Sequence, residues 1–350
     1  MKILFFALIF AFSIHCCLSQ PNEAVARLVK QGIAQHDKGD YAAAIKIYDE
    51  ALQIDKDDYD ANYEKSLSCL YAKRFDECIT ISKYLLEKHP CNADIKAVYS
   101  TYGSALDDNG NPEEGIKIFD KGIKRFPTYH TLYFNKGLTL ARMKKWEDAI
   151  DYFLLALKYK PNHAGSLYYM ALAQEHSNKV AAVLSCLTFL AVEPEGKRAA
   201  TILQYLNNVM GSFAIKGKDG GSVISIDAGD TGNKRKENNF STVQMMLGLT
   251  AAAAFTDSAK STTATEKLSR QIQLLVESLD TGKKEGKGIY WDVYAPFFTG
   301  MKKKELIPVF AHVASITSGD ERNIQWINAN QDRLQEFFKW VGDYQWGGDK

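Results

Sequence analysis

Histidine is the side chain best suited to bind a transition metal or to move a proton near neutral pH. In this chain the histidines are scattered, and no His-x-x-x-His pair or His-Glu-x-x-His motif places two imidazoles on one helical face. We therefore predict no metal site and no histidine-based catalysis. The histidines beyond the first 20 residues are His36, His89, His130, His163, His176 and His312.

The other groups that could do chemistry lie in residues 216–239, which are rich in Gly, Asp, Asn and Lys. Asp227 and Asp230 could offer carboxylates to calcium, but the Asp-x-Asp-x-Asp-Gly spacing and distal Glu of a calcium loop are absent. Ser222 and Ser225 have no histidine nearby in the sequence to activate a nucleophile. The glycines lack the strand and helix that flank a phosphate loop. We predict a solvated loop and no cofactor.

Four of the six cysteines lie beyond the predicted signal peptide of residues 1–19, and their spacings match no zinc-binding box. Three of them sit in helical patterns where a small apolar residue would serve equally well. Buried free thiols are the prediction, with a disulfide between Cys69 and Cys78 as the alternative in an oxidising compartment. The four are Cys69, Cys78, Cys91 and Cys186.

The N-terminus resembles a secretory signal peptide. Lys2 precedes the apolar run of residues 3–14, and small residues follow before a cut that we place after Ser19. Because a run of this length is too short to span a bilayer, we expect no transmembrane segment once residues 1–19 are removed. Export to the periplasm or the medium is predicted. Cysteines near the end of the run leave lipoprotein anchoring as an alternative.

Composition fits an exported globular protein. The 350 residues are 46% hydrophobic and 24% charged, with a formal net charge of +1. Its basic clusters, at residues 234–236 and 302–304, are short and have no interleaved aromatic residues. We therefore predict no nucleic-acid partner.

The elements that would position any functional group are helices. A pattern that recurs upstream at the same spacing is clearest in residues 130–163, where apolar and small residues fall on one face of each of two successive helices before Pro161 ends the second. The first helix places on that face Tyr133, Gly137 and Leu140, and the second Ala149, Phe153 and Ala156.

These residues resemble the tetratricopeptide repeat, in which small residues near the eighth and twentieth positions, here Gly137 and Ala149, let two antiparallel helices approach closely. The resemblance implies an all-α right-handed superhelix of about five helical hairpins, closed by a capping helix at 198–212. It also implies a partner-binding scaffold of the exported bacterial type. The five registers are residues 25–58, 59–92, 96–129, 130–163 and 164–194.

In this family the first helix of each repeat lines a concave groove. The residues that the resemblance assigns to it here are largely aromatic or aliphatic, which is typical of an interaction surface. The Lys and Asn residues with which some members bind the C-terminal carboxylate of cytosolic chaperones are absent. The predicted groove residues are Val29, Ile33, Tyr63, Leu67, Tyr71, Phe134, Leu138, Arg142, Tyr168 and Leu172.

The chain is thus predicted to comprise a signal peptide at 1–19, a repeat array with its capping helix at 25–212, a linker at 213–239 and a C-terminal helical domain at 240–350. The last is aromatic enough to have its own core, and it could instead dock into the groove. No resemblance to a known family assigns functional residues to this C-terminal domain.

The predicted function is an exported, non-enzymatic scaffold or adaptor that binds an unknown protein or peptide through the concave groove. Two alternatives stay open. One is a hydrolase or sugar-handling enzyme with a site in the C-terminal helical domain, for which Asp292 is a candidate acid. The other is a purely structural component of the envelope, in which the groove is filled internally.

Overall fold

The structure is a computed structural model that describes residues 22–174, 178–216, 222–224, 239–253, 263–282 and 286–347. The chain forms two compact units, Met1–Lys124 and Arg125–Lys350. The predicted signal peptide and most of the predicted linker lie outside the described residues, as do Asp227, Asp230 and Ser225.

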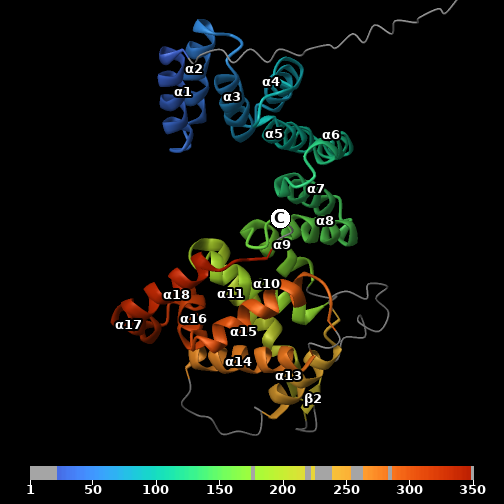
Figure 1. Cartoon of the computed structure of the whole chain (residues 1–350), viewed down its shortest axis with the longest axis vertical. Coiled ribbons are helices and arrows are strands. Elements are labelled where there is room, and N and C mark those ends of the chain that lie inside the picture. The colour runs from blue at the N-terminus through green and yellow to red at the C-terminus, as the bar shows by residue number, and fades with distance from the viewer. Residues whose placement is uncertain are drawn as a thin grey trace, which may run out of the picture. The chain divides into compact units, whose positions relative to one another are not determined.

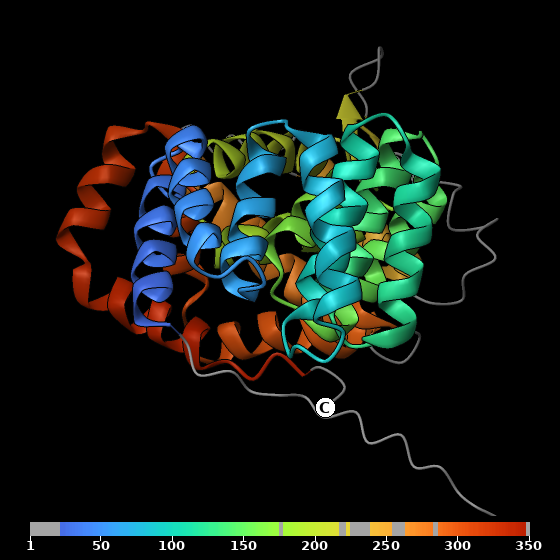
Figure 2. The ribbon, with the colours of Figure 1, turned by 90° about the horizontal axis from the view of Figure 1, so that it is seen from above.

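Unit 1 consists of antiparallel helical hairpins (Figure 1). Successive helices pack against one another, and α1 and α2 lie side by side in both ribbon views (Figures 1 and 2). The helices are α1 (Glu23–His36), α2 (Tyr41–Ile54), α3 (Tyr59–Tyr71), α4 (Phe75–Lys88), α5 (Ile95–Asp108) and α6 (Pro112–Arg125).

Unit 2 continues with two hairpins and a capping helix before the C-terminal helices begin. The first five of its helices are α7 (His130–Arg142), α8 (Trp146–Tyr159), α9 (Ala164–Ala173), α10 (Lys179–Val192) and α11 (Gly196–Gly211). A two-stranded antiparallel ribbon follows, in which β1 (Ala214–Lys216) pairs with β2 (Ser222–Ile224). The predicted all-α fold of paired helices is confirmed, with this ribbon as an addition.

The C-terminal part of unit 2 is helical, and two of its helices meet at Asn330. The described elements are α13 (Ser241–Ala253), α14 (Ala264–Gly282), a π-helical turn η1 (Tyr290–Tyr294), α15 (Ala295–Lys303), α16 (Ile307–Ala314), a 3₁₀ turn η2 (Ile316–Ser318), α17 (Glu321–Ala329) and α18 (Gln331–Asp343).

The repeat period is visible in the backbone of the turns inside each hairpin. Gly39, Lys73, Gly110 and Lys144 each adopt a positive φ, with values of 80°, 60°, 82° and 61°. A left-handed residue at this point ends the first helix and redirects the chain into the second. The positions are 34, 37 and 34 residues apart (73 − 39, 110 − 73 and 144 − 110). The longer interval contains the three extra residues, 93–95, that precede the third repeat in the sequence.

In three of the hairpins an aromatic ring of the second helix lies on a glycine of the first. A Cβ atom added at Gly137 would stand 2.7 Å from Cε1 of Phe153. The small residue is therefore required because the ring occupies the space of a side chain. The corresponding pairs in unit 1 are Gly32 with Tyr48 and Gly103 with Phe119.

Helix α10 is the core of unit 2. Its residues from Val180 to Ala191 are all buried. It contacts α9 and α11 on the repeat side, and α13, α16 and η1 from the C-terminal region. A helix that is apolar all round must be covered on every face, so the C-terminal helices serve as the outer cover of the fifth repeat.

Two buried tyrosines of η1 attach the C-terminal region to the repeats. The hydroxyl of Tyr294 donates to the carbonyl of Pro161 at 2.8 Å. The hydroxyl of Tyr290 and Oγ of Ser185 are 2.6 Å apart and share a hydrogen bond. Burial raises the pKa of both tyrosines well above the ordinary value, so both hydroxyls keep their protons.

The four cysteines within the described residues are free thiols. Burial is confirmed for the three cysteines in helical patterns, Cys69, Cys78 and Cys186, whereas Cys91 is exposed in the turn after α4. Burial raises the pKa of Cys69 and Cys78 to about 12, which keeps them protonated and unreactive. The alternative of a Cys69–Cys78 disulfide is not realised in this structure.

Candidate functional site

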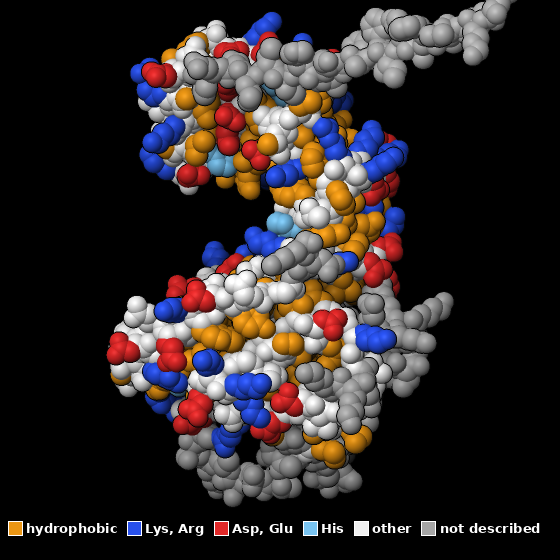
Figure 3. All heavy atoms as spheres, in the orientation of Figure 1, with side chains coloured by type: hydrophobic (Ala, Val, Ile, Leu, Met, Phe, Trp, Pro, Cys, Tyr) orange, Lys and Arg blue, Asp and Glu red, His pale blue; other side chains and the backbone are white. Residues whose placement is uncertain are grey.

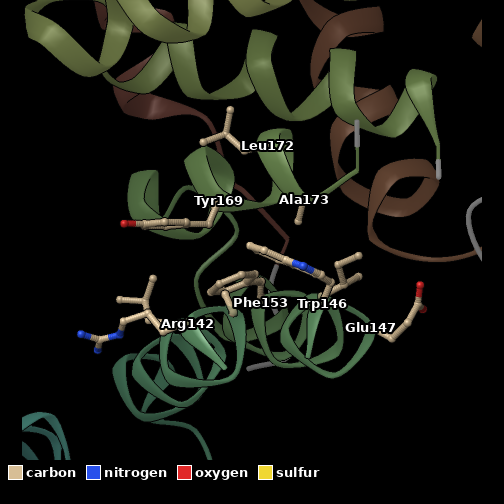
Figure 4. A pocket seen from close by; sticks show the side chains of 10 residues that line it. Arg142, Trp146, Glu147, Phe153, Tyr169, Leu172 and Ala173 are labelled. Atoms are coloured by element: carbon tan, nitrogen blue, oxygen red, sulfur yellow. The ribbon is translucent and has the colours of Figure 1, made fainter. Parts of the chain in front are cut away.

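A pocket of about 910 Å³ lies in unit 2 between the α7–α8 hairpin and helix α9 (Figure 4). We call it the α7–α9 pocket. Its size falls in the range of sites that bind small molecules or several side chains of a peptide. The residues that line it are Leu138, Ala141 and Arg142 of α7, Trp146, Glu147, Ile150 and Phe153 of α8, and Tyr169, Leu172 and Ala173 of α9.

The floor of the α7–α9 pocket is fixed and its rim is open. Ile150 and Phe153 are buried, at 6% and 1% exposure. Trp146 and Tyr169 are 53% and 37% exposed, and Figure 3 shows hydrophobic side chains at the surface over α8. The ring of Tyr169 stacks on that of Phe153 with their centroids 5.8 Å apart. A partner could therefore bury large aromatic surfaces here without first unpacking the core.

The charged side chains of the α7–α9 pocket stand at opposite ends. In Figure 4 the guanidinium of Arg142 and the hydroxyl of Tyr169 point to one side, whereas the carboxylate of Glu147 points to the other. Arg142 belongs to the last turn of α7 and Glu147 to the first turn of α8. The pocket is thus an apolar slot with a basic end and an acidic end.

A cluster of rings supports the floor from behind. Phe134 of α7 lies 6.0 Å from Phe153 and 4.8 Å from His163, measured between ring centroids. His163 precedes α9, and its Nδ1 accepts a hydrogen bond of 3.2 Å from the backbone N–H of Ser166. The ring of His130 packs edge-on against His163 at 4.9 Å. These contacts fix where α9 begins, and so where Tyr169 stands.

Acidification is expected to destabilise unit 2 through these two histidines. Burial, reinforced by the positive charge of Lys160, lowers the pKa of both His130 and His163 from 6.5 to about 4. As the pH falls, these histidines are protonated in the unfolded chain before they are protonated in the folded one. Their contribution to the free energy of unfolding is therefore complete above pH 6.5 and is lost as the pH falls towards 4. We expect a loss of roughly 2 kcal/mol per histidine over that interval.

Urea unfolding at pH 7 and at pH 4.5 measures this effect. All five tryptophans, residues 146, 291, 326, 340 and 346, belong to unit 2, so tryptophan fluorescence reports on that unit alone. The variant carrying His130→Phe and His163→Asn keeps an N-cap side chain at 163 and should show a shallower pH dependence. Identical pH dependence in the variant and the parent would show that other groups are responsible.

The five predicted groove residues of unit 2 do not all reach the pocket. Leu138, Arg142 and Leu172 line it. Phe134 does not line it, but its ring packs against the lining residues Phe153 and Tyr169. Tyr168 points elsewhere: its ring packs against Phe189 of α10, and the guanidinium of Arg198 lies 5.8 Å from its centroid.

The five predicted groove residues of unit 1 are not among the residues that line the α7–α9 pocket. Val29 is buried and Ile33 packs beside it in a small core with Val25, Ala51 and Ala61. Tyr63 and Leu67 are half-buried on α3, and Tyr63 stacks on Tyr59. Tyr71 is 56% exposed and stacks on Tyr41 at 5.5 Å.

Sequence reasoning missed the aromatic residues that dominate the rim and floor. It assigned the binding surface to the first helices only, whereas Trp146, Glu147, Ile150 and Phe153 come from the second helix of the fourth repeat. One signal was available: Trp146, directly after a Lys-Lys turn, is a large apolar residue at an exposed helix start. Such an exposed aromatic residue is typical of interaction sites.

The candidates for chemistry in the C-terminal region are occupied by structural contacts. The Asp292 carboxylate is exposed and accepts a hydrogen bond of 3.2 Å from the backbone N–H of Gly288. Nδ1 of His312 is 2.7 Å from Oδ1 of Asn323, and its ring stacks on Trp326 at 3.7 Å. Within the described residues, no group of three or more His, Cys, Asp or Glu side chains could hold a metal ion.

A search of the described helices for a membrane-spanning segment finds none of sufficient length and apolarity.

The tetratricopeptide repeat family matches this chain at residues 27–58 and 130–163. Among curated proteins, the chain is 28% identical over 111 residues to the photosystem I assembly protein Ycf3 of Prochlorococcus marinus, covering 30% of this chain and 64% of that protein. It is 28% identical over 120 residues to the Hsp70-Hsp90 organizing protein of Triticum aestivum, covering 34% of this chain and 20% of the relative. The chain thus spans less than two thirds of these relatives.

Two solved structures are similar to about half of this chain. A thermophilic tetratricopeptide repeat protein of Thermus thermophilus, TTC0263, covers 53% of this chain and 99% of its own length at 16% identity, with a TM-score of 0.46. The type IV pilus biogenesis factor PilW covers 54% of this chain and 88% of its own length at 18% identity, with a TM-score of 0.45.

Proposed function

Because this chain is a tetratricopeptide repeat protein, we propose that it acts as a scaffold that binds a segment of another protein in the α7–α9 pocket. Relatives named as an assembly protein and as an organizing protein support an adaptor role in protein–protein interaction. The observation that carries the proposal is the pair of exposed aromatic residues, Trp146 and Tyr169, over a buried apolar floor.

The pocket suits a peptide better than a rigid protein surface. Its volume of about 910 Å³ is several times that of one large side chain, so two or three side chains of one segment fit together. Helical or extended segments bind in such grooves through apolar anchors spaced along one face. Trp and Tyr at the rim are the residue types that most often carry binding energy at interfaces.

We propose that the C-terminal helices do not occupy this pocket, so that a partner can bind in it. The pocket is lined by α7, α8 and α9, whereas the C-terminal helices α13 and α16 pack on α10, the other helix of the fifth repeat. We propose that these helices stabilise the fifth repeat, so that α9 is held in place as one wall of the pocket.

We further propose that the scaffold works outside the cytoplasm. The support is the Lys2 and apolar run of residues 3–14, which resemble a secretory signal peptide. Partners would then be exported or envelope proteins. The experiment is a fusion of residues 1–30 to a reporter that is active only after export, with Leu4→Arg and Phe5→Arg as the matched control.

The binding proposal is tested with a displayed library of random peptides. The parent protein should enrich peptides with apolar anchors, and Trp146→Ala with Tyr169→Ala should weaken the selected peptides at least 10-fold, since truncating an interface anchor removes on the order of 2 kcal/mol or more. Leu155→Ala is the control, because Leu155 is a side chain of α8 that is as exposed as Tyr169 and does not line the pocket.

Two results would contradict the proposal. One is the enrichment of no peptide by the folded parent protein. The other is equal loss of affinity in Leu155→Ala and in the rim variant, which would mean that the peptides bind elsewhere or respond to general destabilisation. Circular dichroism of all variants establishes that they are folded.

A further inference from the structure

We infer that unit 1 carries a binding site of its own, which receives a Lys or Arg side chain from a basic segment of a partner protein. The site lies where α1, α2 and α3 meet, and we call it the α1–α3 face. None of its residues lines the α7–α9 pocket, so the inference does not depend on the proposed function. The acidic and aromatic residues that define the face are Asp37, Tyr41, Asp60, Glu64 and Tyr71.

The carboxylates of the α1–α3 face have no positive charge to pair with. Asp60 and Glu64 are one turn apart on α3, so two like charges share one side of the helix. Asp37 follows the last residue of α1 and adds a third. Within the described residues, none of the three forms an ion pair with Lys or Arg. The lysine of α3, Lys65, instead pairs with acidic side chains of α2 and α4, at 2.7 and 2.9 Å.

Ionisation of these carboxylates is unfavourable in the free protein. Burial raises the pKa of Glu64, and the charges of Asp60 and Asp37 raise it further. Burial also raises the pKa of Asp60, together with the charges of Asp58 and Asp94. A bound cation would offset both effects, because it supplies the opposite charge that the described residues do not provide. Uncompensated charge of this kind is more typical of a binding site than of a structural contact.

A buried hydroxyl lies beside the same carboxylates. Tyr48 of α2 is fully buried, and among the described residues its hydroxyl has no hydrogen-bond partner of normal geometry. Burial raises the pKa of this hydroxyl, and the charges of Glu64 and Asp37 raise it further. Ser68, which lowers that pKa, already shares a hydrogen bond of 2.7 Å with Nδ1 of His36. The α1–α3 face therefore includes a second polar group whose hydrogen bonding is incomplete.

Aromatic rings adjoin these acids at the ends of α1 and α3. Tyr41 and Tyr71 stack with their centroids 5.5 Å apart, and the ring of His36 stands edge-on to both, at 5.0 and 5.2 Å. Tyr71 is 56% exposed, so part of its ring is open to a partner. Figure 3 shows acidic side chains among hydrophobic ones on unit 1 near α3. A positive group over an exposed ring gains cation–π attraction.

The chemistry of the α1–α3 face favours an organic cation over a metal ion. No group of three or more His, Cys, Asp or Glu side chains in the described part of the chain could hold a metal. Carboxylates beside aromatic rings suit a Lys ammonium or an Arg guanidinium, because each joins a positive charge to an apolar stem. A basic segment also complements the three negative charges of the face.

The test measures, by fluorescence anisotropy at low salt, the binding of a labelled peptide of four Lys-Gly repeats to the full chain. Asp60→Asn with Glu64→Gln keeps the shape of both side chains and should weaken this peptide about 10-fold. Added salt should reduce the difference. The matched control is Glu50→Gln with Glu113→Gln, which removes the same charge from exposed positions of α2 and α6 and should leave the affinity unchanged.

Two further measurements separate binding from folding. Tyr71→Ala should weaken the peptide about 3-fold or more, whereas Tyr71→Phe should bind it as the parent does, because cation–π attraction needs the ring and not the hydroxyl. Asp60→Asn with Glu64→Gln should resist urea at least as well as the parent, since it removes repulsion between unpaired carboxylates. Weaker binding by a variant of undiminished stability cannot arise from misfolding.

The inference is wrong if the Lys-Gly peptide binds equally to the parent and to Asp60→Asn with Glu64→Gln, or if the control pair loses as much affinity. It is also wrong if the chain self-associates and this double variant abolishes the association, because the face would then bind a second copy. These results leave the α7–α9 pocket untouched, since its test rests on Trp146 and Tyr169 in unit 2.

Discussion

Removing residues 213–350 is expected to leave a repeat array that cannot stay folded and monomeric. The truncated chain, 20–212, should elute as large oligomers in size-exclusion chromatography and should bind a hydrophobic dye strongly, whereas the full chain should do neither. The reason is α10, whose residues from Val180 to Ala191 are all buried and which α13, α16 and η1 cover in the full chain.

The size of the effect follows from the area exposed. If four large aliphatic side chains of α10 lose their cover, about 6–12 kcal/mol of hydrophobic stabilisation is lost. The whole free energy of unfolding of a domain is about 5–15 kcal/mol. The truncation also removes the hydrogen bonds that Tyr290 and Tyr294 make to Ser185 and Pro161. The loss is therefore comparable with the total stability of the unit.

A shorter fragment provides the control. Residues 20–129 end just beyond the boundary between the two units at Lys124, and this fragment is expected to be monomeric and helical although it lacks more of the chain. A well-folded, monomeric 20–212 fragment would show that the C-terminal region is a separable domain, as the sequence predicts from the composition of residues 213–239. An aggregated 20–129 fragment would show that truncation itself is the cause.

How much of this structure is predictable from the sequence depends on the range of the interactions. The hairpins are predictable because each repeat encodes its own close contact, as Gly137 and Phe153 do, at a fixed spacing. The burial of α10 had a local signal as well, since KVAAVLSCLTFLAV is apolar on all faces. No local pattern indicates which segment covers α10, because that segment lies about 100 residues further along the chain. The hydrogen bond between Ser185 and Tyr290 joins the two.

The pocket was only partly predictable for a different reason. Three residues that the sequence assigns to the groove from the first helices, Leu138, Arg142 and Leu172, line the pocket. Whether a pocket opens between two repeats depends on how α9 packs on the α7–α8 hairpin, and no local pattern specifies that packing. Trp146 and Phe153 therefore enter the site from the second helix, where the pattern predicts only packing.

Replacing Gly137 by a larger residue is expected to damage both the fold and the site. A Cβ atom at this position would lie 2.7 and 2.8 Å from two ring atoms of Phe153 and 3.3 Å from the carbonyl oxygen of Ala149. Phe153 is 1% exposed, so its ring has no free space to move into. Overpacking of this kind costs about 1–3 kcal/mol for Ala and more for Leu.

The measurement is the thermal unfolding of unit 2 followed by tryptophan fluorescence. Gly137→Ala should lower Tm by roughly 3–10 °C. Gly342→Ala makes the same chemical change in α18, where an added Cβ would meet no atom within 4 Å, and it should be neutral or raise stability by about 0.5–1 kcal/mol. Equal Tm values for Gly137→Ala and the parent would contradict the close packing of α7 on α8.

Peptide binding gives Gly137→Ala a second measurable consequence. Phe153 forms the floor of the α7–α9 pocket and stacks on Tyr169, so a displaced Phe153 ring also moves a rim residue. At temperatures where the variant is still folded, the selected peptides should therefore bind more weakly to Gly137→Ala but not to Gly342→Ala. A loss of stability with unchanged affinity would mean that the ring relaxes away from the pocket, and would place the binding energy in Trp146 and Leu172 instead.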